Sequence, residues 1–176
     1  MAGKTTELMR YLERAIRGKK RVCLFRPRTD SREFFSHSVA TEITFNNLNI
    51  PIISINEDGT FHEGYTVDSI LKTYDVIGID ECQFIHNLKF IVNTFETKDI
   101  YMSGLLATSE CTVFPSIVDV LPYCDEIIKL NAVCSVCGND LGNYTYHKGG
   151  AKTAEVEVGG ASKYDARCKH CYHLKE

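Results

Sequence analysis

Gly3-Lys4-Thr5 stands near the beginning of the sequence and has the residue types of a phosphate-binding loop. In such a loop, backbone N–H groups and the start of the following helix face the phosphates. The Lys reaches the β- and γ-phosphates, and the Thr hydroxyl holds Mg²⁺. A helical pattern follows at once, which favours a nucleotide site. The alternative is a surface Gly-Lys ahead of a helix that is capped by Thr5 or Thr6.

The full P-loop pattern is G-x-x-x-x-G-K-[ST], and its first Gly would precede Met1. We therefore expect the printed chain to lack the first half of the loop and the strand before it. Phosphate binding needs several consecutive N–H groups, so we expect weak ATP binding until these residues are restored.

Two adjacent carboxylates end the apolar run VIGIDE (76–81). Ligands of open α/β sheets bind at the carboxyl ends of the strands, and an Asp at that position is the Walker B arrangement that faces Mg²⁺. Asp80 fits this position, and Glu81 has the chemistry to accept a proton from an attacking hydroxyl. The alternative is that both acids cap a helix that begins near residue 86.

Four of the eight cysteines form two C-x-x-C pairs, Cys134/Cys137 and Cys168/Cys171. Four thiolates suit tetrahedral Zn²⁺, and because they leave no open coordination position we interpret the zinc as structural. Disulfides are the alternative, and His170 and His173 are competing ligands. The other four cysteines are expected to be small buried apolar residues. They are Cys23, Cys82, Cys111 and Cys124.

The composition argues against a nucleic-acid or membrane surface. Apolar residues make up 44% of the 176 residues, and the net charge of −3 creates no basic field for nucleic acid. No apolar run approaches the ~20 residues of a membrane-spanning helix, and the N-terminus does not resemble a signal peptide. We therefore expect a cytoplasmic protein without direct nucleic-acid binding.

Apolar strands alternate with helices, which predicts an α/β fold with a mostly parallel sheet. Residues 115–134 predict a helix and then a strand that leads into the first cysteine pair. After about residue 132 the composition shifts to Gly, Tyr, Lys and Cys. We predict a core domain over 1–131 and a smaller zinc-binding domain over 132–176. The other expected helices are 5–18, 67–74 and 86–97, and the other expected strands are 22–25, 50–57, 75–81 and 99–105.

Together these stretches resemble one family, the thymidine kinases of the cellular and poxviral type, called type II. The resemblance covers nearly the whole chain. It is carried by MAGKTTELM, TDSR, GIDECQF, KLNAVCSVCG, EVEVGGASKY and CKHCY, in this order. It implies a P-loop α/β core and a small zinc domain with a lasso loop over the substrate. It also implies a homotetramer that transfers the γ-phosphoryl group of ATP to the 5′-hydroxyl of thymidine.

The resemblance assigns roles to individual residues. It implies Glu81 as the general base, and Thr5 and Asp80 as Mg²⁺ ligands. The residues that it places at ATP are Gly3, Lys4, Thr5, Asp30 and Arg32. Those that it places around thymidine are Phe84, Leu105 and Phe114, with Thr145, Val156, Val158 and Tyr164 in the lasso. By composition alone, residues 155–164 would form an ordinary hairpin.

The sequence departs from the family pattern at three places besides its start. Ser109 stands where Phe is common, Leu106 stands where a polar residue is common, and the lasso EVEVGG is one residue short. Ser109 and the short lasso motivate one alternative, a kinase for another deoxynucleoside. The incomplete P-loop motivates a second alternative, a catalytically impaired zinc-containing binding module derived from a kinase.

Overall fold

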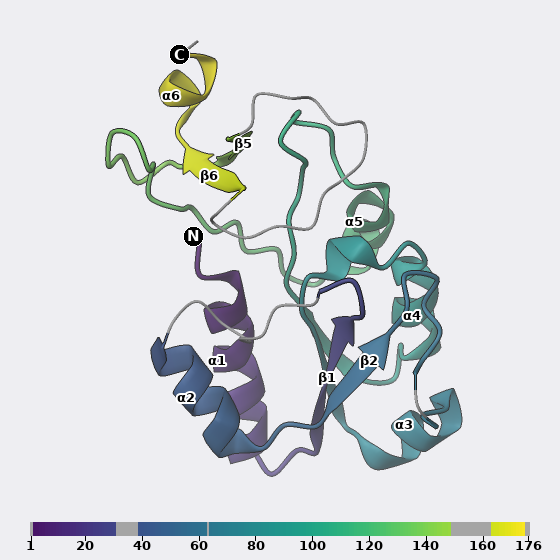
Figure 1. Ribbon diagram of the computed structural model, residues 1–176. Helices are drawn as coiled ribbons and strands as arrows, with labels where there is room; N and C mark the ends of the chain where they lie inside the picture. Colours follow the sequence, from purple (N-terminus) through teal and green to yellow (C-terminus); the bar gives the residue numbers. More distant parts are fainter. Residues whose placement is uncertain (1, 31–38, 63, 149–162, 175–176) are drawn as a thin grey trace. The chain divides into compact units, whose positions relative to one another are not determined.

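The computed structural model describes residues 2–30, 39–62, 64–148 and 163–174 (Figure 1). They form two compact units. The core unit comprises 4–105 and 115–124, and the C-terminal unit comprises 106–114, 125–176 and the first three residues. Arg32, Val156 and Val158 lie outside the described residues. The predicted domain boundary after residue 131 stays a prediction.

The core unit is built on a four-stranded, entirely parallel sheet, which confirms the predicted α/β class. Its strand order is β2-β1-β3-β4, so the chain crosses over between strands. In the register, Phe25 lies opposite both Ile53 and Ile79, and Ile79 lies opposite Met102. The strands are β1 (Val22–Pro27), β2 (Ile52–Ile55), β3 (Val76–Ile79) and β4 (Asp99–Met102).

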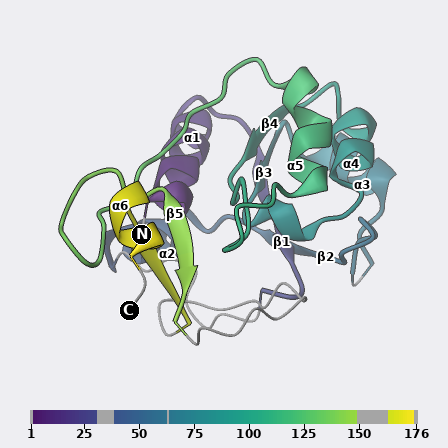
Figure 2. The same cartoon turned by 90° about the horizontal axis from the view of Figure 1, so that it is seen from above.

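Helices cover both faces of this sheet (Figure 2). One face is covered by α1 and α2, and the opposite face by α3, α4 and α5. The helices are α1 (Lys4–Arg17), α2 (Val39–Leu48), α3 (Val67–Thr73), α4 (Leu88–Thr94) and α5 (Pro115–Val120), and two 3-10 turns are η1 (Cys82–Phe84) and η2 (Leu121–Tyr123).

The strand periodicity explains why both faces are apolar. Val22 and Leu24 of β1 pack with α1, whereas Cys23 and Phe25 belong to the core on the other face. Successive side chains of a strand point to opposite faces, so a strand that is buried on both sides reads as a continuous apolar run. This is the pattern from which the strands were predicted.

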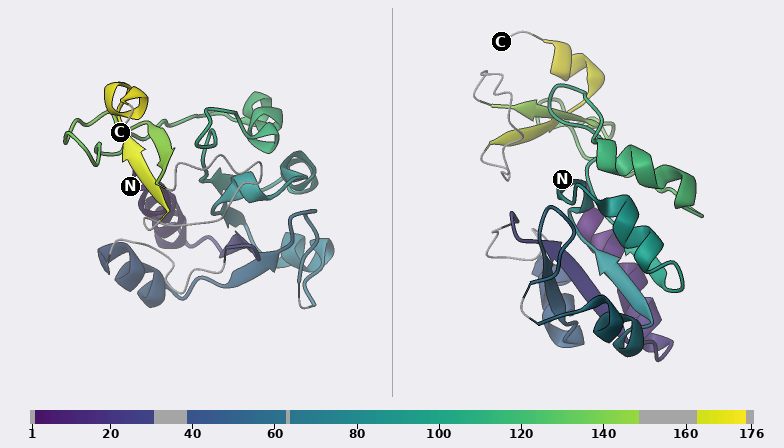
Figure 3. Two further views of the ribbon diagram at one scale, coloured as in Figure 1. Left: turned by 45° about the horizontal axis from the view of Figure 1, so that its top comes forward. Right: turned by 90° about the vertical axis from the view of Figure 1, so that its right-hand side faces the viewer.

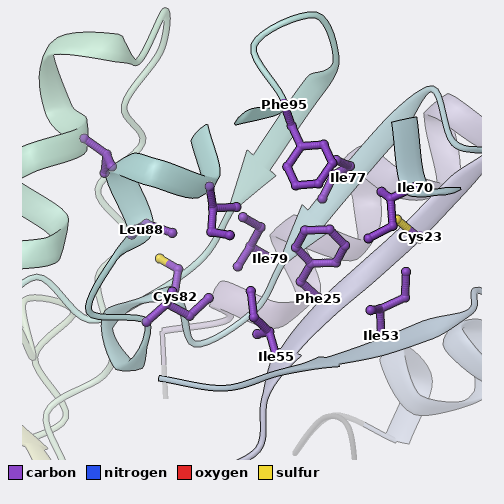
Figure 4. Packing of buried hydrophobic residues seen from close by; sticks show 13 residues of the cluster. Cys23, Phe25, Ile53, Ile55, Ile70, Ile77, Ile79, Cys82, Leu88 and Phe95 are labelled. Carbon is purple, nitrogen blue, oxygen red and sulfur yellow. The ribbon is translucent and has the colours of Figure 1, made fainter. Parts of the chain in front are cut away.

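The larger core cluster is organised around three aromatic rings, of which Figure 4 shows Phe25 and Phe95. Phe25 meets Phe61 and Phe95 edge to face, with ring centroids 5.2 Å and 5.7 Å apart. Edge-to-face pairs of this kind add to the free energy gained by burying the rings. Isoleucines from β2 and β3 belong to the same cluster, so these strands share one continuous core with β1.

The C-terminal unit contains an antiparallel pair, β5 (Tyr144–His147) and β6 (Tyr164–Arg167), followed by helix α6 (Lys169–His173) (Figure 3). A second hairpin spans 106–114, with a bridge between Ala107 and Val113. The Tyr172 hydroxyl of α6 donates a hydrogen bond to the backbone carbonyl of Ser109 at the tip of that hairpin. One side chain therefore fastens the hairpin to the helix.

The strand predicted before the first cysteine pair is wrong. Residues 125–131 are irregular, and Ile127 and Ile128 are 64% and 46% exposed. A strand needs a hydrogen-bonded neighbour, and in the described part of the chain the first bridge of this stretch is the one between Ala132 and Gly142. Helix α2 has no counterpart among the helices predicted from the sequence.

Gly78 of β3 offers a test of this packing. A Cβ atom at this position would lie 2.7 Å from Leu12 Cδ1 and 3.0 Å from Leu24 Cδ1. We expect Gly78→Val to lower the free energy of unfolding by roughly 1–3 kcal/mol, because it overpacks the α1 face. Urea unfolding measures this.

Ile52→Val is the matched control, because Ile52 is 39% exposed on the neighbouring part of the sheet. It should change the free energy of unfolding by less than about 0.5 kcal/mol. Equal midpoints for both variants would contradict the described packing of α1 on β3.

Candidate active site

Asp80, directly after β3, is the residue to which the other segments of the candidate site are hydrogen-bonded. It is fully buried. The Thr5 hydroxyl in the first turn of α1 donates to its carboxylate, 3.2 Å from Oδ2, and the Ser103 hydroxyl donates to Oδ1. Ser103 follows β4 as Asp80 follows β3, and the carboxyl ends of neighbouring parallel strands meet at one edge of a sheet. The structure thus brings together Thr5 and Asp80, two residues predicted from distant parts of the sequence.

The beginning of α1 has the conformation that its sequence predicts. Gly3 has a φ of 75°, a left-handed conformation that glycine adopts without strain, and the helix begins at Lys4. The Thr6 hydroxyl lies 2.9 Å from the Thr41 hydroxyl of α2. Because Thr5 and Thr6 lie inside the first turn and both form tertiary hydrogen bonds, the alternative in which they cap the helix is wrong.

Glu81 has a left-handed backbone, with a φ of 48°. This conformation costs a non-glycine residue roughly 1–2 kcal/mol, and such outliers cluster at functional sites. Its half-buried carboxylate accepts a hydrogen bond from Gln83 Nε2, 2.7 Å from Oε2. The N-cap of α4 is Asn87, and Glu81 makes no side-chain cap hydrogen bond, so the alternative that the acids cap this helix is also wrong.

A buried ion pair lies at the carboxyl end of β1. Arg26 Nε donates to Asp30 Oδ2 at 3.0 Å, and the two side chains are 14% and 1% exposed. The backbone N–H of Asp30 donates to the Pro27 carbonyl, which closes a tight turn. The chain leaves β1 with Asp30 fixed in place.

The remaining described residues of the predicted nucleoside pocket divide between the two units. Phe84 and Leu105 belong to the core unit, and the Leu105 N–H donates to Gln83 Oε1 at 3.0 Å. Phe114, Thr145 and Tyr164 belong to the C-terminal unit. There Tyr164 packs against His147 of β5, with ring centroids 5.2 Å apart.

The four paired cysteines converge in the C-terminal unit. The sulfur atoms of Cys134, Cys137, Cys168 and Cys171 all lie within 4.8 Å of one another. Cys137 Sγ is 3.7 Å from Cys168 Sγ, close to the ~3.8 Å that a tetrahedron with Zn–S bonds of ~2.3 Å requires. All eight cysteines are among the described residues and none forms a disulfide, so that alternative is wrong.

The surroundings of the four cysteines affect how readily their thiols lose a proton. The backbone N–H of Cys168, with those of Cys137 and Val136, lowers the pKa of the Cys134 thiol, whereas burial and the neighbouring thiols raise the pKa of Cys171. The thiolate is the form that binds metal, so the N–H groups around Cys134 favour the metal-binding form of that residue. Within the described residues the cluster consists of the four cysteines. His173 packs instead against the ring of Tyr172, with centroids 5.2 Å apart.

The other four cysteines only partly match their prediction. Cys23 and Cys82 are buried, and burial raises the pKa of both thiols. Cys124 is half-buried, and Cys111 is exposed at the tip of the 106–114 hairpin with a φ of 60°. The expectation that Cys111 is buried is wrong, because a hairpin tip has no second layer above it.

Three residues of the site were missed from the sequence. Ser103 had a usable signal, since it follows a predicted buried strand just as Asp80 does. Gln83 lies in the GIDECQF stretch but was given no role. Arg26 stands in a strand, where an isolated Arg gives no sign of a partner four residues later.

A helix that begins against the carboxyl edge of a parallel sheet, with a threonine hydroxyl on a buried strand-end Asp, defines the class of P-loop-type phosphotransferases. The comparison with known proteins narrows this class. Residues 1–172 match the thymidine kinase family, and the chain belongs to that family. It is thus a member of a family of kinases that transfer phosphate to thymidine.

Curated thymidine kinases are similar in sequence along nearly the whole chain. A thymidine kinase of Pseudothermotoga lettingae is 30% identical, over 98% of this chain and 89% of its own length. Those of Amsacta moorei entomopoxvirus and Thermococcus kodakarensis are 31% and 32% identical, over 98% of this chain and 92% and 89% of their own lengths. None of the described helices has the length and apolar composition that a membrane-spanning helix needs.

Ser103 allows a test of the Asp80 environment. We expect Ser103→Ala to destabilise the protein by about 1–3 kcal/mol, because a buried carboxylate loses a hydrogen-bond donor. Ser54→Ala on β2 is the control, since Ser54 is exposed. Urea unfolding of both variants decides this, and equal free energies of unfolding would show that Ser103 does not support Asp80.

Proposed function

We propose that this protein transfers the γ-phosphoryl group of ATP to the 5′-hydroxyl of thymidine, producing dTMP for nucleotide salvage. The observation that carries the proposal is the Asp80–Glu81 pair at the end of β3, with Thr5 of α1 hydrogen-bonded to Asp80. Membership of the thymidine kinase family supports thymidine as the acceptor.

On the ATP side, the roles follow from the start of α1. Gly3 and Lys4 would offer backbone N–H groups and an ammonium group to the phosphates, because they stand at the N-terminus of a helix. Thr5 and Asp80 would hold Mg²⁺, since a hydroxyl and a carboxylate 3.2 Å apart offer the oxygen ligands that this ion prefers. When bound, Mg²⁺ neutralises charge on the β- and γ-phosphates. We also assign Asp30 and Arg32 to the ATP site, on the family resemblance.

Glu81 serves as the general base. The thymidine 5′-oxygen attacks the γ-phosphorus, the bond from that phosphorus to the bridging oxygen breaks, and ADP leaves. The proton of the hydroxyl passes to the Glu81 carboxylate. The left-handed backbone of Glu81 and the hydrogen bond from Gln83 support this role, because they give the carboxylate a defined direction.

We assign the nucleoside contacts on the family resemblance. A lasso that excludes water would limit the hydrolysis of ATP. The homotetramer and the cytoplasmic location remain predictions. The proposed nucleoside contacts are Phe84, Leu105, Phe114, Thr145, Val156, Val158 and Tyr164.

The zinc proposed at the four cysteines is structural. Four protein ligands fill a tetrahedral site, so no coordination position remains for water or substrate. The convergence of the four sulfur atoms supports this assignment.

The direct test is product formation by the purified full-length protein with ATP and Mg²⁺. Thymidine, deoxyuridine and deoxycytidine are offered separately and in competition. Preferential conversion of thymidine to dTMP is the expected result. Preference for another nucleoside would establish the first alternative, and nucleoside binding without turnover would establish the impaired module.

Glu81→Gln tests the base. The amide keeps the size of the side chain but cannot take a proton, so kcat should fall by roughly 10²–10⁴-fold with little change in thymidine affinity. Glu57→Gln is the control, because Glu57 is an exposed glutamate outside the site. A loss of less than about threefold in Glu81→Gln would show that another group accepts the proton.

Metal content tests the cysteine cluster. Purified protein should contain one zinc per chain by elemental analysis, and Cys168→Ser should lower both the zinc content and the melting temperature, since structural zinc contributes to folding stability. Cys111→Ser, at an exposed cysteine outside the cluster, should keep the full zinc content. Well under one zinc per chain in the unsubstituted protein would contradict the assignment.

A further inference from the structure

Gln83 is a buried amide beside the proposed base. It lies in η1, two residues after Glu81, and only 2% of it is exposed. Its side-chain Nε2 donates to Glu81 Oε2 at 2.7 Å, and its Oε1 accepts from the Leu105 N–H at 3.0 Å. Both ends of one amide are thus engaged, one on the proposed base and the other on the backbone after β4.

The two hydrogen bonds fix the orientation of the amide. A backbone N–H can only donate, so the atom that faces Leu105 must be the oxygen of Gln83. The nitrogen is then forced to face Glu81, and it can only donate. The orientation of the donor is therefore set by the backbone and does not depend on the protonation of Glu81.

The surroundings hold Gln83 in this place. The Ser116 hydroxyl of α5 donates to the backbone carbonyl of Gln83 at 3.3 Å. A Cβ atom at Gly104 would lie 2.8 Å from Gln83 Oε1 and 2.7 Å from Cys82 Sγ. The amide therefore fits against the backbone only because residue 104 has no side chain.

We propose that Gln83 is a positioning residue for phosphoryl transfer, which holds the Glu81 carboxylate towards the nucleoside hydroxyl by donating a hydrogen bond to one of its oxygens. The proposal rests on the proposed role of Glu81 as the base. A base that is displaced by about 1 Å can lose up to about 10²-fold in rate, so a fixed donor beside it has a measurable effect.

The experiment compares two substitutions in the full-length protein. Gln83→Met keeps the size and loses both hydrogen bonds. Gln83→Glu keeps an oxygen for the Leu105 N–H but replaces the donor to Glu81 with a second carboxylate. We expect kcat to fall about 10- to 100-fold in both variants, with the KM for thymidine changed less than about threefold.

Two further readouts separate positioning from a general structural role. In Gln83→Glu the acid limb of the pH–rate profile should move to higher pH, because two adjacent carboxylates disfavour the doubly ionised state. In a Glu81→Gln background, Gln83→Met should lower kcat by less than about twofold, since the group it positions is already lost. Gly104→Ala should reproduce the loss of kcat by displacing the amide.

Three results would overturn the proposal. The first is full activity of Gln83→Met. The second is full activity of Gln83→Glu, which would show that residue 83 only needs to accept the hydrogen bond from the Leu105 N–H. The third is a loss in the Glu81→Gln background as large as in the unsubstituted protein. Full activity of Glu81→Gln alone is a separate outcome, because it would remove the proposed base and this inference with it.

Discussion

A buried carboxylate is the constraint on which the rest of the site depends. Asp80 is fully buried, and burying a charge is costly unless it is hydrogen-bonded. Thr5, at the start of α1, and Ser103, directly after β4, donate hydrogen bonds to this carboxylate. The carboxylate therefore ties together three segments that are far apart in the sequence. A shift of any one of them would leave Asp80 with fewer donors, so the edge of the sheet is held in one arrangement.

The same edge leaves little room around Glu81. Its backbone is left-handed, Gln83 donates a hydrogen bond to its carboxylate, and Gly104 has no space for a side chain. Such local strain persists only where the surrounding structure is rigid. Here the surrounding structure is a sheet that is covered by helices on both faces, with Phe25 and its aromatic neighbours in the core.

The C-terminal unit is stabilised differently. Its cluster of buried apolar residues, within the described chain, consists of three cysteines, Cys134, Cys168 and Cys171. A segment of this size buries too little apolar surface to fold strongly on its own, and a structural metal commonly supplies the difference. The Tyr172 hydroxyl then fastens the 106–114 hairpin to the helix that carries Cys171. Helix α6 thus carries both a cysteine of the cluster and the side chain that holds the hairpin.

The sequence by itself determined the strands, whose apolar runs require burial on both faces, and the positions of Asp80, Glu81 and the four cysteines. The types and spacings of these residues indicate their chemistry without any knowledge of the neighbouring residues in the fold. It could not show that Ser103 reaches Asp80, that Gln83 turns its amide towards Glu81 or that Arg26 pairs with Asp30. It wrongly predicted a strand within 125–131, because a β-rich composition cannot supply the neighbouring backbone that a strand needs. The strand order β2-β1-β3-β4 determines which side chains meet at the sheet edge. Only the tertiary structure decides that order, because strand order depends on pairing between segments that are distant in the sequence.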